Sequence, residues 1–287
     1  MPRNASPEVR RRRLAAELRR LRAESRLKTT EVAERLGWSP SKVSRYELAR
    51  TGFKLSDVRQ MLTFYRVETK RQKELLALAK EASERGWWED FSDVLPEEHI
   101  SLIGLEDEAT AEWTWHLEVM PGLLQTEEYA RHVNSKGYSL APVPPGQIER
   151  SVEVRMKRQE LLTRDPPLAL SVVIDEAVLR RRVGGPDVMR RQLNHLIAVA
   201  QLPNVSLRVL LLEDETPMLI SSFNLLRFGD QAARMPDVVY TEHFRATLYF
   251  EGESDTYQYR IVFQRLQEGA LDGSESLDFI GQVMRQI

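Results

Sequence analysis

The chain has 287 residues, 42% of them hydrophobic and 29% charged, which is the balance of a globular protein with room for two domains. It contains no cysteine, which excludes disulfides, thiolate metal sites and cysteine-based catalysis. No apolar run reaches the roughly 18–20 residues of a membrane span, and the arginine run at 10–13 is not followed by the apolar segment of a signal peptide. We therefore expect a soluble protein of the cytoplasm.

The net charge of −2 conceals an uneven distribution along the chain. Residues 1–86 contain 22 Lys and Arg against 11 Asp and Glu, whereas the remaining residues contain 19 against 32. A basic segment on an acidic body is typical of a domain that neutralises phosphates, because each cation on a phosphate releases counterions. A solvated helical face rich in arginine would show the same surplus, so charge alone leaves both interpretations open.

The first 86 residues are predicted to be helical throughout, because no segment alternates as a strand does. Gly37 can adopt the left-handed conformation that ends a helix, and Ser39 followed by Pro40 is a typical helix start. We expect five helices. The first opens at Pro7 and Glu8, the second covers 31–36 after a cap in 28–30, and the third covers 40–48. The fourth is capped by Ser56 and Asp57 and ends at Tyr65, and the fifth covers 68–85.

Three residues separate the second and third predicted helices, which is the spacing of a helix-turn-helix. In that motif one helix braces across the DNA backbone while the next enters the major groove. The contacts between the two helices are predicted to come from Val32, Ala33, Leu36, Val43 and Tyr46. The residues predicted to contact DNA are Thr29, Ser39, Ser41, Lys42, Ser44, Arg45, Arg50 and Lys54.

Ser41, Lys42 and Arg45 share one face of the third helix, because they lie three and four residues apart. Arg45 is the best candidate for bidentate recognition of guanine. Thr29 and the backbone N–H groups that follow it suit phosphate contacts. The alternative is a helix-turn-helix that serves only protein contact.

The stretch TTEVAERLG at 29–37, continued by SRYE at 44–47, resembles the Xre or phage-repressor family of helix-turn-helix proteins. The resemblance covers about residues 10–66 and implies a λ-repressor-like domain. It also implies a structural ion pair between Arg22 of the first helix and Glu47 at the end of the recognition helix. Where that family often has glutamine at the starts of both helices, this chain has Thr29 and Pro40, so the operator is not inferred.

A domain boundary is predicted near 86–88, which gives a helix-turn-helix domain over 1–86 and a mixed α/β regulatory domain over 87–287. The alternation over 113–120 predicts a half-buried strand. The overall class is α+β: an all-α N-terminal domain followed by a mixed α/β domain. Further strands are expected over 168–174 and 205–212 and in a meander over 223–228, 238–242 and 247–250, with helices over 176–182, 186–200, 255–267 and from 274 onward.

Four strings, at 120–130, 155–159, 174–180 and 192–196, resemble the C-terminal domain of actinobacterial regulators of the WhiJ-like type, whose function is unassigned. The resemblance spans roughly 87–287. It implies a domain that responds to a ligand or to a small protein encoded nearby.

The candidate regulatory site in this domain comprises Pro121, Gly122, Gln125, Thr126 and Tyr129. A structural role is the alternative, with Pro121 and Gly122 in a turn and Thr126 capping a helix. Two other groups also have a functional and a structural interpretation. Asp175 and Glu176 are either a paired-carboxylate site or the cap of a helix. The arginines at 180–182 either bind an anion or form a solvated face.

Catalytic motifs are missing from the sequence. His116 and Glu118 match the His-x-Glu of zinc deaminases, but that site also needs cysteine. The strand order resembles half of a phospholipase-D-like protein, yet the His-x-Lys of that chemistry is absent at 220–224. The five histidines lack metal-ligand spacing. We therefore predict no enzyme, no cofactor and no metal, and an uncharacterised C-terminal enzyme is the weaker alternative.

Together these features predict a sequence-specific transcriptional regulator that binds double-stranded DNA as a homodimer, since one helix-turn-helix buries too little surface to be both tight and selective. A small partner protein or ligand would control it through the C-terminal domain, and it would work in the cytoplasm on the nucleoid. An antitoxin-like interaction module with secondary DNA binding is the alternative. The operator, the effector and the sign of regulation stay open.

Overall fold

The computed structural model describes residues 7–49, 51–136, 142–213, 220–229, 236–243 and 246–287. The chain divides into two compact units, Met1–Glu89 and Asp90–Ile287, which we call unit 1 and unit 2. No helix in the described ranges has the length and apolar character needed to cross a bilayer.

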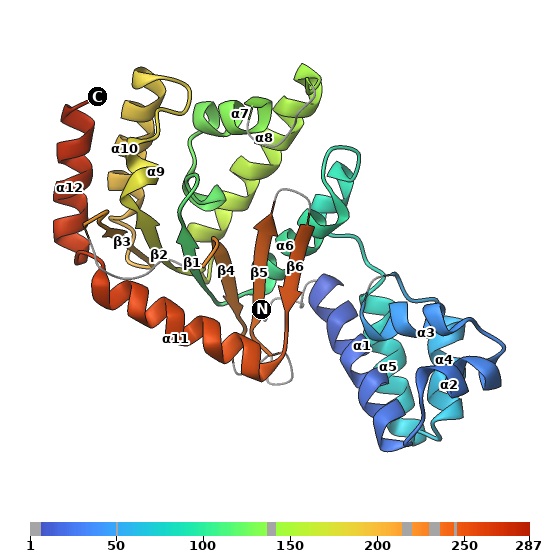
Figure 1. The fold of residues 1–287 in the computed structure, drawn as a ribbon. Helices are drawn as coiled ribbons and strands as arrows, with labels where there is room; N and C mark the ends of the chain where they lie inside the picture. The colour runs from blue at the N-terminus through green and yellow to red at the C-terminus, as the bar shows by residue number, and fades with distance from the viewer. Residues whose placement is uncertain (1–6, 50, 137–141, 214–219, 230–235, 244–245) are drawn as a thin grey trace. The chain divides into compact units, whose positions relative to one another are not determined.

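Unit 1 is built from helices (Figure 1), and their inner faces form two adjoining clusters of apolar side chains. The larger cluster is buried because apolar side chains recur at helical spacing on the inner face of each helix. Its members include Leu14, Leu18, Met61, Leu62 and Leu75. The helices are α1 (Pro7–Glu24), α2 (Thr29–Leu36), α3 (Pro40–Glu47), α4 (Leu55–Phe64) and α5 (Thr69–Glu81), followed by a 3-10 turn, η1 (Trp87–Phe91).

Two predicted helix ends in unit 1 are wrong. Helix α4 begins at Leu55, so Ser56 and Asp57 lie inside its first turn and do not cap it. Helix α5 ends at Glu81 and not at Arg85, because Ser83 and Glu84 leave the helix in turns. Sequence spacing located both helices but not these ends, which depend on backbone hydrogen bonds.

Unit 2 contains one mixed sheet with strand order β3-β2-β1-β4-β5-β6. Strands β1, β2 and β3 run parallel, whereas β4, β5 and β6 continue from β1 as an antiparallel meander. This confirms the α+β class of the chain. The strands are β1 (Ala111–His116), β2 (Ala169–Asp175), β3 (Val205–Leu210), β4 (Phe223–Arg227), β5 (Val238–His243) and β6 (Ala246–Phe250).

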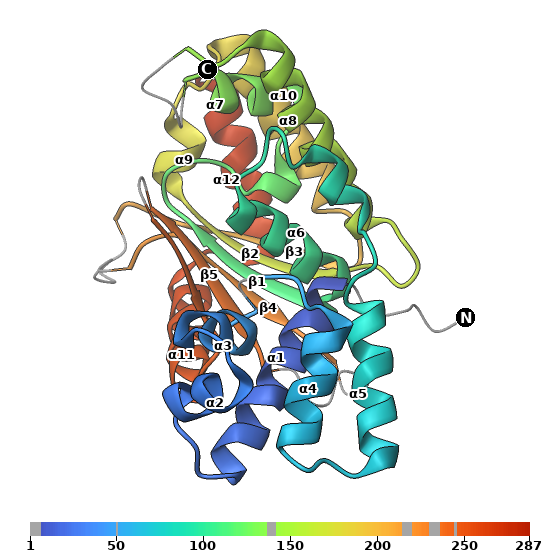
Figure 2. The same cartoon turned by 90° about the vertical axis from the view of Figure 1, so that its right-hand side faces the viewer.

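Helices cover both faces of the sheet, with α11 against one face and α6 and α8 on the other (Figure 2). The α11 face is apolar: Trp115, Phe223 and Val239 of the sheet pack with Phe263 of α11. The helices of unit 2 are α6 (Glu97–Glu108), α7 (Glu127–Lys136), α8 (Pro145–Gln159), α9 (Glu176–Arg180), α10 (Pro186–Val199), α11 (Glu253–Gly269) and α12 (Gly273–Arg285), with 3-10 turns η2 (Gly122–Leu124) and η3 (Glu160–Leu162).

The prediction of a half-buried strand over 113–120 is wrong in two respects. Strand β1 ends at His116, and both of its faces are buried, with Glu112 and Thr114 as inaccessible as Trp115. The reason is topological, because β1 lies between β2 and β4 under helices on both sides. Its polar face therefore points into the protein and not to solvent.

Candidate C-terminal site and candidate DNA interface

The predicted regulatory residues at 121–129 form part of the structural core of unit 2. Tyr129 is fully buried, and its hydroxyl accepts a hydrogen bond from the backbone N–H of Met120 at 3.2 Å. Thr126 caps α7 by accepting from the N–H of Tyr129 at 3.3 Å. Pro121 is buried just before η2, and Gly122, the first residue of η2, is half-buried. This segment is hydrogen-bonded within the fold, as the structural alternative expected.

Gln125 is the clearest case, since it is 1% exposed and both polar atoms of its amide are hydrogen-bonded. Its Nε2 donates to the Met120 carbonyl at 2.7 Å, and its Oε1 accepts from Arg155 Nη1 at 2.7 Å. The glutamine therefore joins the turn after β1 to α8 from a buried position.

The sheet face beneath α6 and α8 carries a row of buried polar side chains that the sequence did not reveal. Cross-strand pairing places Thr114 beside Asn224, and Asn224 beside Tyr240, so this one face collects polar groups from β1, β4 and β5. Glu112 lies on the same face, where it accepts a hydrogen bond from Asn224 at 2.5 Å. A polar face inside a domain is costly unless its groups are paired or used.

Above this face, Arg158 of α8 makes a bidentate ion pair with Glu106 of α6, at 2.8 and 2.6 Å. Neither side chain is more than 7% exposed. Burial, together with the nearby Glu106 carboxylate, raises the pKa of Glu112 to about 8, so Glu112 is protonated at neutral pH. Its Oε2 has no hydrogen-bond partner among the described residues.

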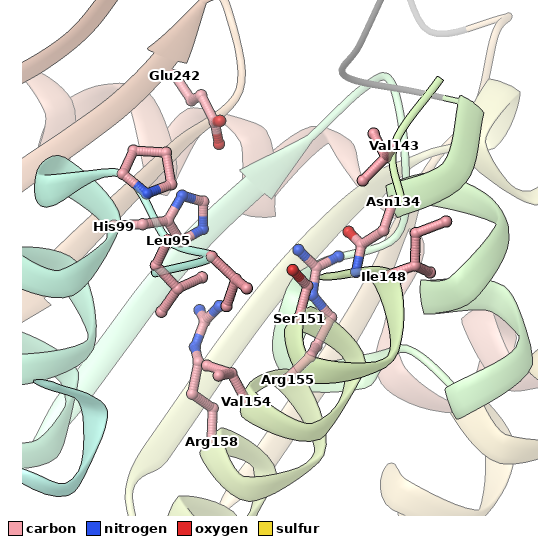
Figure 3. A pocket seen from close by; sticks show the side chains of 12 residues that line it. Leu95, His99, Asn134, Val143, Ile148, Ser151, Val154, Arg155, Arg158 and Glu242 are labelled. Atoms are coloured by element: carbon pink, nitrogen blue, oxygen red, sulfur yellow. The ribbon is translucent and has the colours of Figure 1, made fainter. Parts of the chain in front are cut away.

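A small cavity of about 210 Å³ lies between α6, α8 and β5 (Figure 3). Apolar side chains of 94–96 and 143–154 line it together with His99, Arg155, Arg158 and Glu242. Burial, reinforced by the two arginines, lowers the pKa of His99 to about 3, so its ring is neutral. Burial also raises the pKa of Glu242. Apolar and polar side chains thus share the small cavity, and burial favours the neutral forms of both His99 and Glu242.

A larger cavity of about 780 Å³ opens at the carboxyl ends of β1 and β5 and shares Glu242 with the small cavity. We call it the edge cavity. Burial lowers the pKa of His116 at its floor to about 4. The residues that line it are His116, Glu118, Val119, His132, Val133, Arg181, Arg182, Val183, Gly184, Gly185, Ser222, Asn224, Tyr240, Glu242 and His243.

The two ambiguous groups near this edge separate in the structure. Asp175 caps α9, accepting from the N–H of Ala177 at 2.8 Å, while Glu176 pairs with Arg180 at 2.5 Å. These three residues are therefore structural. Arg181 and Arg182 are exposed and belong to the edge cavity lining.

In unit 1, α2 and α3 form the helix-turn-helix. Gly37 ends α2 with a φ of 67°, and Ser39 begins α3 by accepting from the N–H of Lys42 at 3.2 Å. Val32 and Val43 are fully buried between the helices. The turn is local in origin, because a left-handed glycine followed by a serine cap and a proline fixes where one helix stops and the next starts.

The outer face of α3 presents Ser41 and Arg45 to solvent, with Ser44 half-exposed beside them. No ion pair within the described part of the chain engages Arg45. Lys54 and Ser39 are also exposed, Thr29 is half-exposed, and Arg50 lies outside the described residues. The exposed members of the predicted DNA-binding set thus gather on and around α3.

Lys42 departs from the expected outward arrangement. Its ammonium group pairs with Asp57 of α4 at 2.8 Å and lies 3.7 Å from the ring centre of Trp38. Tyr46 donates a hydrogen bond to the same carboxylate at 2.6 Å. Although burial opposes it, hydrogen bonding from Lys42 and Tyr46 lowers the pKa of Asp57. Lys42 therefore joins α3 to α4, and contact with DNA would require this pair to open.

Arg22 of α1 and Glu47 of α3 form a bidentate ion pair, with the guanidinium Nε and Nη2 donating at 2.7 and 2.8 Å. Arg22 Nη1 also donates to the Leu27 carbonyl at 2.8 Å. The Glu47 side chain is only 4% exposed. One guanidinium thus connects the end of α3 to α1 and to the segment before α2.

The N-terminus of α2 already holds a negative charge. The carboxylate of Glu31 accepts a hydrogen bond from the Lys28 N–H at 2.7 Å, in the manner of a capping box. Thr29 is the first residue of the helix and does not cap it. A DNA phosphate at this end would meet Glu31, so the phosphate contact of Thr29 stays a prediction.

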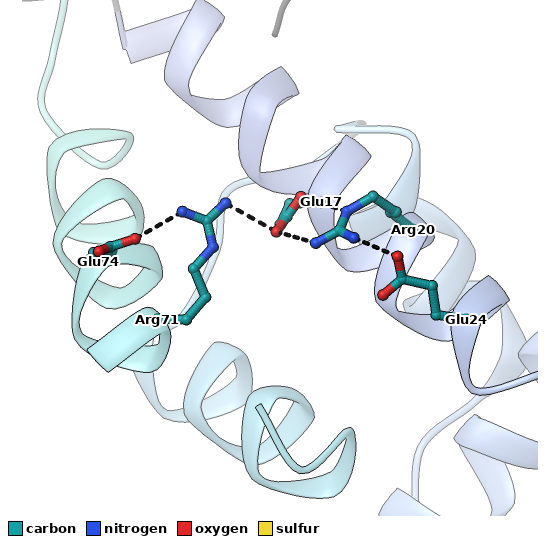
Figure 4. A network of polar contacts seen from close by, with 5 residues as sticks. All are labelled: Glu17, Arg20, Glu24, Arg71 and Glu74. Carbon is teal, nitrogen blue, oxygen red and sulfur yellow. Dashed lines mark hydrogen bonds and ion pairs between the residues drawn. The ribbon is translucent and has the colours of Figure 1, made fainter. Parts of the chain in front are cut away.

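An ion-pair network fastens α1 to α5 behind the helix-turn-helix (Figure 4). Glu17 accepts from Arg20 at 2.7 Å and from Arg71 of α5 at 2.9 Å, and Arg71 also donates to Glu74 at 2.7 Å. Arg20 also pairs with Glu24. Hydrogen bonds from Arg20 and then Arg71 outweigh burial and lower the pKa of Glu17 to about 2.

Replacing Glu17 by glutamine is expected to cost about 1 kcal/mol of unfolding free energy at neutral pH, because the pair is only partly shielded from water. Since the folded pKa lies below the unfolded value, this contribution is present above about pH 4.5 and is lost as the pH falls toward 2. Urea unfolding of both proteins at neutral pH and near pH 2 measures it. A difference that persists undiminished at the acidic pH would contradict the assignment.

Comparison with known proteins finds two matching families. A family model described as "Domain of unknown function (DUF5753)" matches residues 100–282, and one described as "Helix-turn-helix domain" matches residues 13–76. No curated protein and no solved structure matches the chain. The first match covers more than half of the chain and lies within unit 2, and the second contains α2 and α3 whole.

Proposed function

The chain belongs to the family described as domain of unknown function (DUF5753), and from that premise we propose that it is a sequence-specific DNA-binding transcriptional regulator controlled through unit 2. One observation carries the proposal: within a helix-turn-helix, α3 buries Val43, Tyr46 and Glu47 and leaves Ser41 and Arg45 facing solvent. A helix with that division can enter a major groove while its inner face stays packed.

The finer parts of the proposal follow from the sequence. We propose a homodimer that reads two half-sites, a cytoplasmic location on the nucleoid, and a relation to Xre-type regulators of actinobacteria of the WhiJ-like kind. Control would come from a small partner protein or a ligand. The basic balance of residues 1–86 supports phosphate binding by this end of the chain. We propose no reaction for unit 2, and an antitoxin-like interaction module is the second candidate.

Arg45→Ala is expected to weaken binding to the operator by about 1–3 kcal/mol, roughly 10-fold to 100-fold, because a bidentate contact to one base would be lost. The operator is first identified by genome-wide immunoprecipitation at native expression. Binding of the purified variant is then measured by fluorescence anisotropy on operator and on random DNA at one salt concentration, because the phosphate contribution depends on salt.

Arg19→Ala is the matched control, since Arg19 is an exposed arginine of α1 without an ion pair among the described residues. It removes the same charge and should weaken both DNAs equally and slightly. Equal weakening of both DNAs by Arg45→Ala would refute base reading by α3. A flat immunoprecipitation profile would favour the interaction-module candidate over the regulator.

A further inference from the structure

The position of the edge cavity within the sheet is that of a ligand site. It opens at the carboxyl ends of the parallel strands, where the chain direction reverses between β1 and β4. Open sheets with parallel strands commonly bind ligands in the crevice outside the carboxyl ends of those strands. Its volume of about 780 Å³ lies within the range of small-molecule sites.

The floor of the edge cavity contains a buried polar atom that the fold leaves unused. His116 ends β1, and its Nε2 is buried without a hydrogen-bond partner among the described residues. Asn224 and Tyr240 line the same floor from β4 and β5. Buried polar groups are normally paired, and a bound water or ligand accounts for an unpaired one beside a cavity.

One wall of the edge cavity suits an anion. Arg181 and Arg182 are exposed, and no ion pair in the described ranges engages either of them. The next residues, Gly184 and Gly185, have φ angles of 72° and 91° and lead directly into α10. No side chain caps this 14-residue helix, and the carboxylate of Asp187 in its first turn pairs with Arg190 at 2.9 Å, so the first N–H groups have no side-chain acceptor.

Gly184 is required at its position for a second reason. A Cβ atom there would lie 2.9 Å from the ring of His132 and 2.9 Å from Val188, closer than atoms can approach. The histidine ring donates from Nδ1 to the Glu128 carbonyl at 2.9 Å. The loop is thus pressed against α7, which holds the arginine wall against the cavity.

The other side of the edge cavity suits hydroxyl groups. Glu118 follows β1, and Glu242 lies near the end of β5. The oxygens of a carboxyl group accept hydrogen bonds, so both side chains match the hydroxyls of a sugar. Ser222 already donates to Glu118, which leaves further lone pairs on the carboxylate. Cationic and acidic walls therefore belong to one cavity.

We propose that the edge cavity binds a phosphate ester that carries free hydroxyl groups, as a nucleotide or a sugar phosphate does. Its phosphate contacts Arg181, Arg182 and the start of α10. Its hydroxyl groups donate to Glu118 and Glu242. A further polar group of the ligand forms a hydrogen bond with Nε2 of His116. Coupling of this site to DNA rests on the proposed function, whereas the site itself does not.

Isothermal titration calorimetry on the full chain without DNA tests the site, with ADP, ribose 5-phosphate, adenosine and inorganic phosphate as probes. We expect ADP or ribose 5-phosphate to bind, and the double variant R181A/R182A to weaken that binding at least about tenfold. The matched control R265A/R285A removes two exposed arginines of α11 and α12 that do not line the cavity. It should leave the affinity unchanged.

Glu118→Gln tests the acidic side of the edge cavity independently of the arginines. It should weaken ribose 5-phosphate or ADP and leave the affinity for inorganic phosphate unchanged, because only the esters carry hydroxyl groups. The unliganded melting temperature of each variant shows that it is folded. Preference for ADP over ribose 5-phosphate identifies a nucleotide site, and the reverse identifies a sugar phosphate site.

Two results would overturn the proposal: no probe binds with a dissociation constant below about 1 mM, or adenosine binds as tightly as ADP and R181A/R182A has no effect. Because DNA is absent, these results do not depend on the regulator proposal. If the chain binds its operator but none of the probes, only the proposed ligand site is rejected. If it binds ADP through Arg181 and Arg182 but no operator, the ligand site stands and only the regulator proposal is rejected.

Discussion

Arg158→Leu is expected to lower the unfolding free energy of unit 2 by about 3–5 kcal/mol, the largest effect of any single side chain considered. The substitution removes a guanidinium that donates at 2.8 and 2.6 Å to Glu106. Glu106 is 0% exposed, so its carboxylate would have neither its ion partner nor water. Leaving one charge of a buried pair uncompensated costs more than the pair itself contributes.

Urea unfolding of the full chain measures this loss, with far-ultraviolet circular dichroism following both units. Leucine retains packing in place of the aliphatic stem of the arginine, so little packing should be lost near the end of α8. The double variant E106Q/R158L is the control, because it removes both charges. It should recover much of the stability. If the single and double variants lose the same amount, the pair is hydrated and its burial is not the source of the effect.

The cost of this pair also bears on function. Apolar residues of similar volume often replace a buried ion pair without loss of stability. Yet the face beneath α6 and α8 keeps Glu106, Arg158 and Glu112 together, and Arg158 and Glu242 line the small cavity. The opposite face, under α11, has the ordinary apolar packing of Trp115 and Phe223. The buried ionisable groups Glu106, Glu112 and Arg158 thus gather on the face that contains the small cavity and the edge cavity, as expected where a domain keeps groups for binding.

The DNA-binding part was predictable because its signals are local. Gly37, Ser39 and Pro40 determine the end of α2 and the start of α3 through their own backbone preferences. The Arg22–Glu47 pair came from the family resemblance, since nothing in sequence spacing joins residues 25 positions apart. The unforeseen contact was Lys42 with Asp57, because its position depends on how α4 packs on α3.

The buried polar groups and the cavities of unit 2 were not predictable, because they are assembled from distant segments. Arg158 and Glu106 are 52 residues apart, and the alternation at 113–116 gave the right period for β1 but not the burial of its polar side. An amphipathic strand between two others looks the same in sequence as one facing water. The unusual string at 121–129 drew attention to a structural turn, whereas the edge cavity collects its residues from α7, β1, β4, β5 and the loop after α9.

Arg22→Ala is expected to destabilise unit 1 by about 3 kcal/mol and to weaken operator binding through the position of α3. Without the guanidinium, the 4% exposed carboxylate of Glu47 and the Leu27 carbonyl both lose their donors. Arg22→Lys should recover only part of the loss, because an ammonium group cannot reproduce the planar bidentate contact. Urea unfolding measures stability, and anisotropy on operator and random DNA measures binding.

Arg19→Ala on the same helix serves again as the control and should change stability by less than about 0.5 kcal/mol. Arg22 holds the end of α3 in place and contacts no base, so its loss should weaken binding to operator and random DNA together. The loss of Arg45 should instead weaken binding to the operator selectively. This difference separates a residue that positions the recognition helix from one that reads sequence. If Arg22→Ala weakened only operator binding at unchanged stability, Arg22 would contact DNA and the structural assignment of the pair would be wrong.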